Sequence, residues 1–351
     1  MTETKTTSSH NQNSSEPLDP RDTGAKQKTK VAVFGLGFIG RMVFESIRSQ
    51  SFFLKRPLEL VAAVDIVSES CDWAISKGVP AYQSLASMLE HVRPDVIIHT
   101  TASNMNVVVA HLREMIEAKI PVVSSTEELF FPWVQNPTIA RDLDALCVRN
   151  GVAVIGTGVN PGFIMDVLPA KLTQVCQSVD QFKVTRVVNA SSRRLPLQRK
   201  IGVGLDQDTF KASITNGRIN PVGLMESVDF LANHMGWQLT KSGQSIEPVI
   251  ADRALSIGAI SVKKGNVTGL RHQAWGEVDR KKVILLDLKI YLEAERPGDH
   301  IVIMGNPPMN LWIEGGTPGD LGAVSSLIRG IPIVMQARPG IVRRLEREHY
   351  W

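Results

Sequence analysis

Two adjacent carboxylates, Glu127 and Glu128, stand where a short β-branched run ends and aromatic side chains begin, in the stretch VVSSTEELFFPW at residues 122–133. A carboxylate can hold an ammonium group and then accept a proton from it. Burial against rings such as Phe131 and Trp133 would raise the pKa of that carboxyl group toward neutrality. Acids are also favoured in the first turn of a helix, which leaves a purely structural alternative open. The pair is therefore a candidate general base.

A second chemical motif is GLGFIG at residues 35–40, which has the spacing GxGxxG. It follows the apolar run KVAVFG and precedes an amphipathic segment, which is the context of a dinucleotide-binding turn. In that setting Gly35 permits the tight turn, Gly37 lets the backbone approach a pyrophosphate, and Gly40 lets the helix lie close to the sheet. Free N–H groups at the helix N-terminus would hold the phosphates. The candidate phosphate-binding residues are Gly35, Leu36, Gly37, Phe38, Ile39 and Gly40.

Further cofactor contacts are expected where two other apolar runs end. Asp65 lies at the place where an acid binds the ribose hydroxyls of adenosine, and the residues after it, IVSES, contain no Lys or Arg. NAD is therefore favoured over NADP, although another loop could supply a base. In HTTASN, at 99–104, the histidine is expected to be hydrogen-bonded and partly buried. The residues of this stretch expected to line the cofactor are Thr100, Thr101 and Ser103.

The elements that position these residues alternate between apolar runs and amphipathic segments. The predicted strands are 30–35, 58–66, 95–101, 121–126 and 152–158. Ser84 is expected to cap a short helix, and Asn136 a longer one at 136–151. Strands separated by helices form a parallel sheet, and ligands bind beyond its carboxyl ends, where the two acids emerge. The sequence therefore predicts an α/β Rossmann-type parallel-sheet domain at residues 29–158.

The pattern changes in the second half of the chain. Strand-like stretches separated by turn residues, with a helix at 223–237, predict a mixed, mainly antiparallel sheet with helices. We therefore expect an α+β substrate and dimerisation domain at 159–318. Residues 319–351 are expected to form a C-terminal helix that returns to the first domain. Small-molecule sites favour clefts between domains, so the reacting ends of cofactor and substrate are expected there.

The bulk composition excludes several partners. The 351 residues carry 39 Lys and Arg against 35 Asp and Glu, a net charge of +4 without a long basic run, so no nucleic-acid partner is expected. No apolar run reaches the roughly 18 residues that a membrane span needs. Residues 1–28 almost lack apolar side chains and are expected to be a disordered tail without a secretory signal. The three cysteines have no CxxC spacing, which indicates reduced thiols in a cytoplasmic protein and no metal site.

Longer stretches carry a family resemblance. The segment 125–169, with its specific block GTGVNPGFIMD, resembles the 2,4-diaminopentanoate dehydrogenases, which are grouped with the native amine dehydrogenases and have a dihydrodipicolinate-reductase-like N-terminal domain. GVGLDQDTFKASITNGRI at 202–219 and TPGDLGAV near the C-terminus extend the resemblance over about residues 30–342. It implies a homodimer and NAD- or NADP-dependent oxidative deamination of an amine to a ketone and ammonia, or the reverse reductive amination.

The resemblance also implies roles for single residues. It places the catalytic carboxylate at Glu127 or Glu128, with Glu127 favoured. It implies that Arg199 meets a substrate carboxylate. The other residues expected around the nicotinamide and substrate are Asn160, Pro161, Phe163, Phe131 and Trp133. The extra cations in NASSRRLP at 189–196 leave the substrate open. Two alternatives remain, a reductase of a cyclic imine or semialdehyde on the same scaffold and a non-catalytic dinucleotide sensor.

Overall fold

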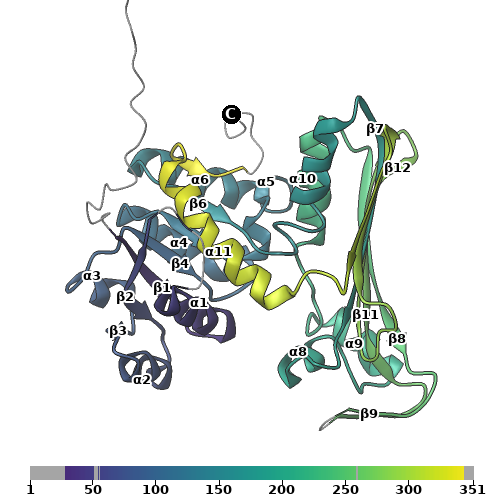
Figure 1. Ribbon diagram of the computed structural model, residues 1–351, viewed down its shortest axis with the longest axis horizontal. Coiled ribbons are helices and arrows are strands. Elements are labelled where there is room, and N and C mark those ends of the chain that lie inside the picture. The colour runs from purple at the N-terminus through teal and green to yellow at the C-terminus, as the bar shows by residue number, and fades with distance from the viewer. Residues whose placement is uncertain (1–27, 51–53, 55, 258–259, 344–351) are drawn as a thin grey trace, which may run out of the picture.

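The computed structural model describes residues 28–50, 54, 56–257 and 260–343. Except for Lys28, the expected disordered tail lies outside the described residues. The described chain forms two sheets with helices around them, and the C-terminal helix runs from the second sheet back to the first (Figure 1).

The first sheet has seven strands in the order β15-β6-β5-β4-β1-β2-β3, and all its pairs are parallel. Its strands are β1 Thr29–Phe34, β2 Leu58–Val64, β3 Ala81–Tyr82, β4 Val96–His99, β5 Val122–Ser124, β6 Ala153–Gly156 and β15 Gly340–Ile341. The Rossmann-type prediction is therefore confirmed. The strand order reverses between β1 and β4, the kind of switch point where dinucleotides bind. The sequence missed β3 and β15 because two residues are too few to show a period.

Helices cover both faces of this sheet, which explains why its strands are continuously apolar. The segments on this domain are α1 Phe38–Ser49, α2 Ser68–Ser76, α3 Leu85–Leu89, α4 Met105–Glu117, the 3-10 turn η1 Glu127–Leu129, α5 Pro132–Gln135 and α6 Pro137–Asn150. Helices α1 and α11 (Gly319–Gln336) contribute to one buried cluster, and α3, α4 and α6 contribute to another.

The two predicted caps have different outcomes. The Ser84 hydroxyl accepts a hydrogen bond from the Ser87 backbone N–H at 3.1 Å, so that cap is confirmed. Asn136 is the N-cap residue of α6 and Pro137 the first helical residue, as predicted, but the Asn136 side chain makes no capping hydrogen bond. The reason is that α5 runs directly into α6. The Asn136 N–H donates to the Pro132 carbonyl at 2.9 Å, which makes this residue the end of α5 as well.

The second sheet has six strands in the order β14-β13-β7-β12-β11-β8 and is antiparallel except for the pair β12 and β7, as the sequence broadly predicted. Its strands are β7 Ser178–Asn189, β8 Lys241–Ile250, β11 Val267–Val278, β12 Lys281–Tyr291, β13 Gly298–Asn306 and β14 Met309–Glu314, with a separate hairpin of β9 Leu255–Ile257 and β10 Ile260–Val262. The helical segments here are α7 Val167–Leu172, η2 Thr173–Val175, α8 Leu195–Lys200, α9 Gln207–Thr215 and α10 Leu224–Met235. Helix α10 packs on the sheet through Val228 and Leu231.

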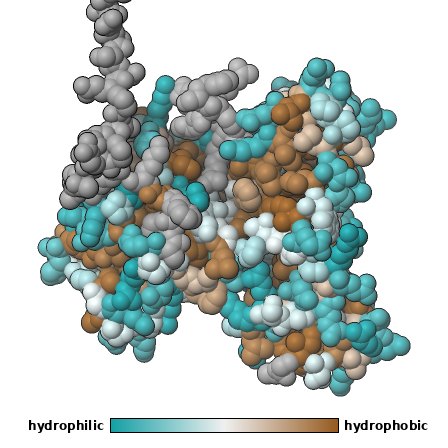
Figure 2. Space-filling view, in the orientation of Figure 1, coloured by the Kyte–Doolittle hydropathy of each residue, from teal (hydrophilic) through white to brown (hydrophobic). Residues whose placement is uncertain are grey.

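Helix α11 joins the two sheets. Its buried residues Leu327, Ile331 and Val334 belong to the same cluster as the β-strands of the first sheet. Where the chain enters this helix, a buried ion pair anchors it to the second sheet: Arg186 donates to Asp299 at 2.7 Å and to the Thr317 carbonyl at 2.7 Å. Figure 2 shows the notch that remains between the two parts of the molecule below this connection.

Candidate active site

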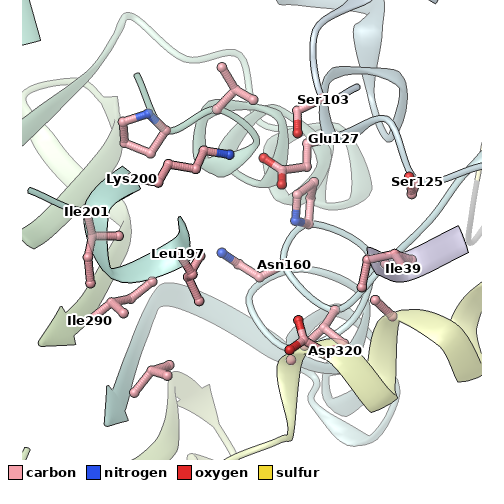
Figure 3. Close-up of a pocket in the computed structure, with 18 of the residues that line it drawn as sticks. Ile39, Ser103, Ser125, Glu127, Asn160, Leu197, Lys200, Ile201, Ile290 and Asp320 are labelled. Carbon is pink, nitrogen blue, oxygen red and sulfur yellow. The ribbon is translucent and has the colours of Figure 1, made fainter. Parts of the chain in front are cut away.

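A cavity of about 500 Å³ lies between the carboxyl edge of the first sheet and the second sheet. The residues that line it come from the start of α1, the segments after β4, β5 and β6, helix α8, the second sheet and the first turn of α11 (Figure 3). From the sequence candidates the cavity gathers Gly37, Phe38, Ile39, Thr100, Thr101, Ser103, Glu127, Asn160 and Pro161.

The glycine loop has the geometry that a pyrophosphate needs. Gly35 has φ +97°, and a Cβ on Gly40 would lie 1.8 Å from the Gly35 carbonyl oxygen, so helix and loop are in direct contact. A Cβ on Gly37 would meet no protein atom within 4 Å. Helix α1 has no capping side chain and no acid in its first turn, which leaves its N–H groups and positive end free for an anion. The loop therefore fits the phosphates of a dinucleotide.

Asp65 lies beside this loop, at the end of β2. Its carboxylate accepts hydrogen bonds from the Leu36 N–H at 2.6 Å and the Val67 N–H at 2.9 Å. The structure also brings Arg41 near, since its Nε donates to the Leu36 carbonyl at 3.0 Å and its guanidinium lies 4.7 Å from the centroid of the Trp73 ring. Arg41 is the base from another segment that the sequence left open. It belongs to α1 and precedes Asp65 in the chain, whereas the residues directly after Asp65 contain no base.

The segment after β4 supports the loop as well as lining the cavity. The Thr100 hydroxyl donates to the Gly35 carbonyl at 2.7 Å. His99 is fully buried and hydrogen-bonds to Ser124 at 2.9 Å and Thr101 at 2.8 Å. Burial, and then the neighbouring His111, lower the pKa of His99 to about 3, so the ring is neutral. His99 is thus a hydrogen-bonded histidine, as expected, although it is completely rather than partly buried.

The adjacent acids Glu127 and Glu128 both lie in the turn η1, but their side chains have different surroundings. Glu128 accepts hydrogen bonds from the Met105 N–H at 2.6 Å and the Asn104 side chain at 3.1 Å, so it caps α4. Glu127 instead lines the cavity. Glu128 therefore fits the structural alternative, an acid that stabilises a helix N-terminus. It does not line the cavity that Glu127 enters.

The environment of Glu127 tunes its acidity. Glu127 is half-buried, because part of its surface borders the cavity, but protein surrounds its carboxyl group. This burial raises the pKa of Glu127 to about 7, against the opposing effects of the Lys200 charge and the Ser103 hydrogen bond. Figure 3 shows the Lys200 ammonium group directed toward the Glu127 carboxylate from the opposite wall, with Ser103 beside it. A carboxyl with a pKa near neutrality can exchange protons in both directions.

Two polar atoms at the end of β6 lack a partner among the described residues. They are the Thr157 hydroxyl, in a residue that is 3% exposed, and the Asn160 side-chain carbonyl. Both residues line the cavity, and buried polar atoms are nearly always hydrogen-bonded. The turn that presents Asn160 is held by buried Asp166, which accepts hydrogen bonds from the Gly162 N–H and the Ser227 hydroxyl at 2.9 and 2.8 Å. The unpaired atoms fit the polar groups of a bound nicotinamide nucleotide.

Four residues expected in the substrate pocket do not line the cavity. Phe131 is buried against Phe230 of α10, and the Trp133 ring contacts Arg343 instead. Phe163 lies beyond the Gly162 turn and is 37% exposed. Arg199 is exposed on α8, where the helical turn directs the next residue, Lys200, toward the cavity. The structure therefore places these four side chains outside this cavity.

Several lining residues escaped the sequence analysis, chiefly Lys200, Arg193, Arg194, His272 and Asp320. All three cations stand in the stretch RRLPLQRK, whose unusual basic density marked the segment but not the side that it faces. His272 hydrogen-bonds to Gln244 at 2.8 Å, and burial lowers the pKa of its ring to about 4. Arg193 forms an ion pair with Asp320 at 2.8 Å.

The described residues also bear on metal binding and on membrane association. Within the described ranges, no group of three or more His, Cys, Asp or Glu side chains is arranged to hold a metal ion. In the same ranges, no helix combines the length and apolar character needed to cross a membrane.

The sequence and fold match known proteins over nearly the whole described chain. The model of the 2,4-diaminopentanoate dehydrogenase C-terminal domain matches residues 163–347, and the oxidoreductase family model with an NAD-binding Rossmann fold matches residues 29–156. The 2,4-diaminopentanoate dehydrogenase of Acetoanaerobium sticklandii is 29% identical over 329 residues, which are 90% of this chain and 92% of that protein.

Solved structures share the fold. An amine dehydrogenase from Mycobacterium smegmatis has a TM-score of 0.77 at 23% identity, with 93% of this chain and 98% of that chain covered. GenD2 from gentamicin A biosynthesis, in complex with NAD, has a TM-score of 0.54 at 15% identity, with 92% and 89% covered. The resemblance read from the block GTGVNPGFIMD is confirmed by the match over more than half of the chain. The chain belongs to the 2,4-diaminopentanoate dehydrogenase family, and it is a dehydrogenase with an NAD-binding Rossmann domain.

Proposed function

We propose that this dehydrogenase acts on an amine, which it converts to a ketone and ammonia or forms in the reverse direction. The observation that carries the proposal is Glu127, a single carboxyl group with a pKa of about 7 on the wall of the cavity that also contains the glycine loop. A buried carboxylate suits a substrate that must be held as an ammonium ion and then deprotonated. The family relative named as a 2,4-diaminopentanoate dehydrogenase supports this choice.

Glu127 has two tasks in this reaction. Bound NAD would supply the acceptor for the hydride that leaves the carbon next to nitrogen. The nitrogen can release that hydride only as the free amine, so ionised Glu127 first removes a proton from the ammonium group. The proton taken from the ammonium group passes to solvent, so the carboxylate is ionised again once the iminium ion has formed. It can then take a proton from the attacking water and pass it to the nitrogen, which leaves as ammonia when the hydroxyl group of the adduct loses its proton and becomes the ketone carbonyl. Ser103, which hydrogen-bonds to Glu127, would orient the carboxylate.

The remaining walls suggest the class of amine. Leu197, Ile201 and Ile290 provide an apolar surface for an aliphatic chain. Lys200 lies opposite Glu127 and could pair with a substrate carboxylate, the role that the family resemblance implies for Arg199. We therefore propose a short aliphatic amine that carries a carboxylate, as in a diamino acid.

We propose NAD as the preferred cofactor. The Asp65 carboxylate beside the glycine loop would accept hydrogen bonds from the ribose hydroxyls and would repel a 2′-phosphate. Arg41 hydrogen-bonds to Leu36 and Ser70 near this point, and its positive charge would reduce the repulsion between Asp65 and a 2′-phosphate. Comparing kcat/KM for NAD with that for NADP tests the preference, and a higher value with NADP contradicts it.

We also propose a homodimer formed through the second sheet. Figure 1 shows α10 on one side of this sheet. The opposite side carries half-buried Trp275, Leu285 and Val302, whose neighbours Ala274, Leu286 and Ile301 point into the core beneath α10. A sheet face with apolar side chains favours association. A solution mass equal to one chain would contradict this proposal.

A cofactor-reduction assay tests the reaction. Diamino acids, simple amines and the matching alcohols are each incubated with NAD, and NADH and ammonia are both measured. We expect equal amounts of NADH and ammonia with an amine and no NADH with an alcohol. NADH formed without ammonia would favour a reaction on a semialdehyde or imine, and cofactor binding without turnover on any substrate would favour a sensor.

The pH dependence of the rate should report the raised pKa of Glu127. Amine oxidation needs the carboxylate form, so kcat should rise about tenfold per pH unit below pH 7 and level off above it. Reductive amination needs the protonated form of Glu127, so its rate should be constant below pH 7 and fall as the pH rises above 7. The measurement is kcat at saturating substrate across this range. Persistence of the same limb in Glu127→Gln would assign it to another group.

A further inference from the structure

We propose that Arg194, from the domain opposite the glycine loop, binds the pyrophosphate of the dinucleotide. The cofactor would then be held by both walls of the cleft. This inference rests on the NAD-binding part of the function and is independent of which amine reacts.

The position of Arg194 is the first argument. It immediately precedes α8 and lines the same cavity as Gly37 and Phe38. Its guanidinium carbon lies 3.8 Å from the centroid of the Phe38 ring, and Phe38 is the first residue of α1. The guanidinium thus contacts the first residue of the helix whose N-terminus the fold offers to phosphates.

The charge balance at the loop is the second argument. A pyrophosphate carries two negative charges, whereas a helix N-terminus supplies only about half of one positive charge. The first turn of α1 contributes no acid, and the cation on α1 itself, Arg41, is engaged with Leu36, Ser70 and Trp73. A further cation is therefore needed, and guanidinium groups match phosphate oxygens with two parallel hydrogen bonds.

The third argument is that Arg194 is not neutralised. Its neighbour Arg193 pairs with Asp320 at 2.8 Å, and Arg186 pairs with Asp299 at 2.7 Å. Among the described residues, Arg194 has no carboxylate partner, and its guanidinium instead makes a cation–π contact with the Phe38 ring. Three arginines thus line the cavity, and among the described residues Arg194 is the one of the three that no carboxylate pairs.

Phosphate binding by Arg194 would also organise the substrate wall. The helix that follows it, α8, carries Leu197 and Lys200 into the cavity opposite Glu127. Fixing the start of this helix on the cofactor would hold that wall in place. Arg194 is therefore a binding residue for the cofactor and a positioning residue for the substrate side.

The test measures dissociation constants of NADH and of ADP-ribose, which lacks the nicotinamide, for Arg194→Gln, Arg194→Lys and Arg199→Gln. Arg199 is a matched control, because it lies on α8 and is exposed but does not line the cavity. Losing a charge-assisted contact to phosphate should weaken both ligands about tenfold in Arg194→Gln. Arg194→Lys should show a smaller loss, since it keeps the charge without the fork of donors. Arg199→Gln should bind both ligands as the wild type does.

Three results would overturn the proposal: unchanged binding in Arg194→Gln, a loss confined to NADH, or an equal loss in Arg199→Gln. The first result would mean that Arg194 does not contact the phosphates. The second would mean that it contacts the nicotinamide half of the cofactor, and the third that the loss reflects only the net positive charge of this region. Unfolding temperatures without ligand separate binding from folding, and Arg194→Lys serves if the glutamine variant is unstable. A failed amine assay would leave these binding results intact, so the two proposals fail separately.

Discussion

Replacing Glu127 by Gln is expected to lower kcat for amine oxidation by about 10²–10⁴-fold, the range typical for loss of a general acid–base group. Gln keeps the shape of the side chain but cannot accept the proton that the substrate ammonium must lose. The affinity for NADH should be unchanged, because the residue lies at the substrate end of the cavity, opposite Lys200. Steady-state rates with a saturating amine and NADH titrations provide the two measurements.

Glu128→Gln is the matched control, because it makes the same change one residue away. Glu128 accepts hydrogen bonds from Met105 and Asn104 at the start of α4, so its loss should cost about 1 kcal/mol in the free energy of unfolding. Its effect on kcat should be much smaller than that of Glu127→Gln. If instead Glu128→Gln abolishes turnover while Glu127→Gln retains it, the assignment of the two acids is reversed.

Gly40→Ala is expected to lose cofactor binding together with stability. An added Cβ would lie 1.8 Å from the Gly35 carbonyl oxygen and 2.7 Å from the Thr100 hydroxyl, so α1 must move away from the loop. A forced backbone shift of this kind typically costs about 1–3 kcal/mol in the free energy of unfolding. Urea denaturation and NADH titration should both detect the change.

Gly37→Ala separates the two effects. Gly37 has φ −66°, which alanine adopts without strain, and its Cβ would meet no protein atom within 4 Å. Stability should therefore stay within about 0.5 kcal/mol of the wild type. NADH should still bind at least about tenfold more weakly, because the methyl group occupies the space through which the backbone approaches the pyrophosphate. Wild-type affinity in Gly37→Ala would show that the phosphates pass elsewhere.

The sequence by itself determined the first sheet and the edge at which the candidate site lies. Strands β1, β2, β4, β5 and β6 could be predicted because each is a buried apolar run between helices, a pattern that belongs to the segment alone. The glycine loop was equally local, since the spacing of Gly35, Gly37 and Gly40 is itself the geometric requirement. The edge followed from parallel pairing, which puts the carboxyl ends of these strands together.

Only the tertiary structure separated the two acids. In a 3-10 turn, neighbouring side chains point about 120° apart, so Glu127 and Glu128 cannot share a direction. Which of them enters the cavity depends on where the start of α4 lies, because that start binds Glu128. This information is absent from residues 122–133.

The second wall of the cavity was also beyond the sequence. Lys200 rather than Arg199 faces Glu127, and within the described part of the chain Asp320 of α11 pairs with Arg193 rather than with Arg194, because α8 and the first turn of α11 meet there in one particular way. Phe131 and Trp133 turned out to pack against α10 and Arg343 for the same reason. A local pattern determines which residues can form a strand or a phosphate loop, whereas the partner of each polar side chain is decided by segments distant in the chain.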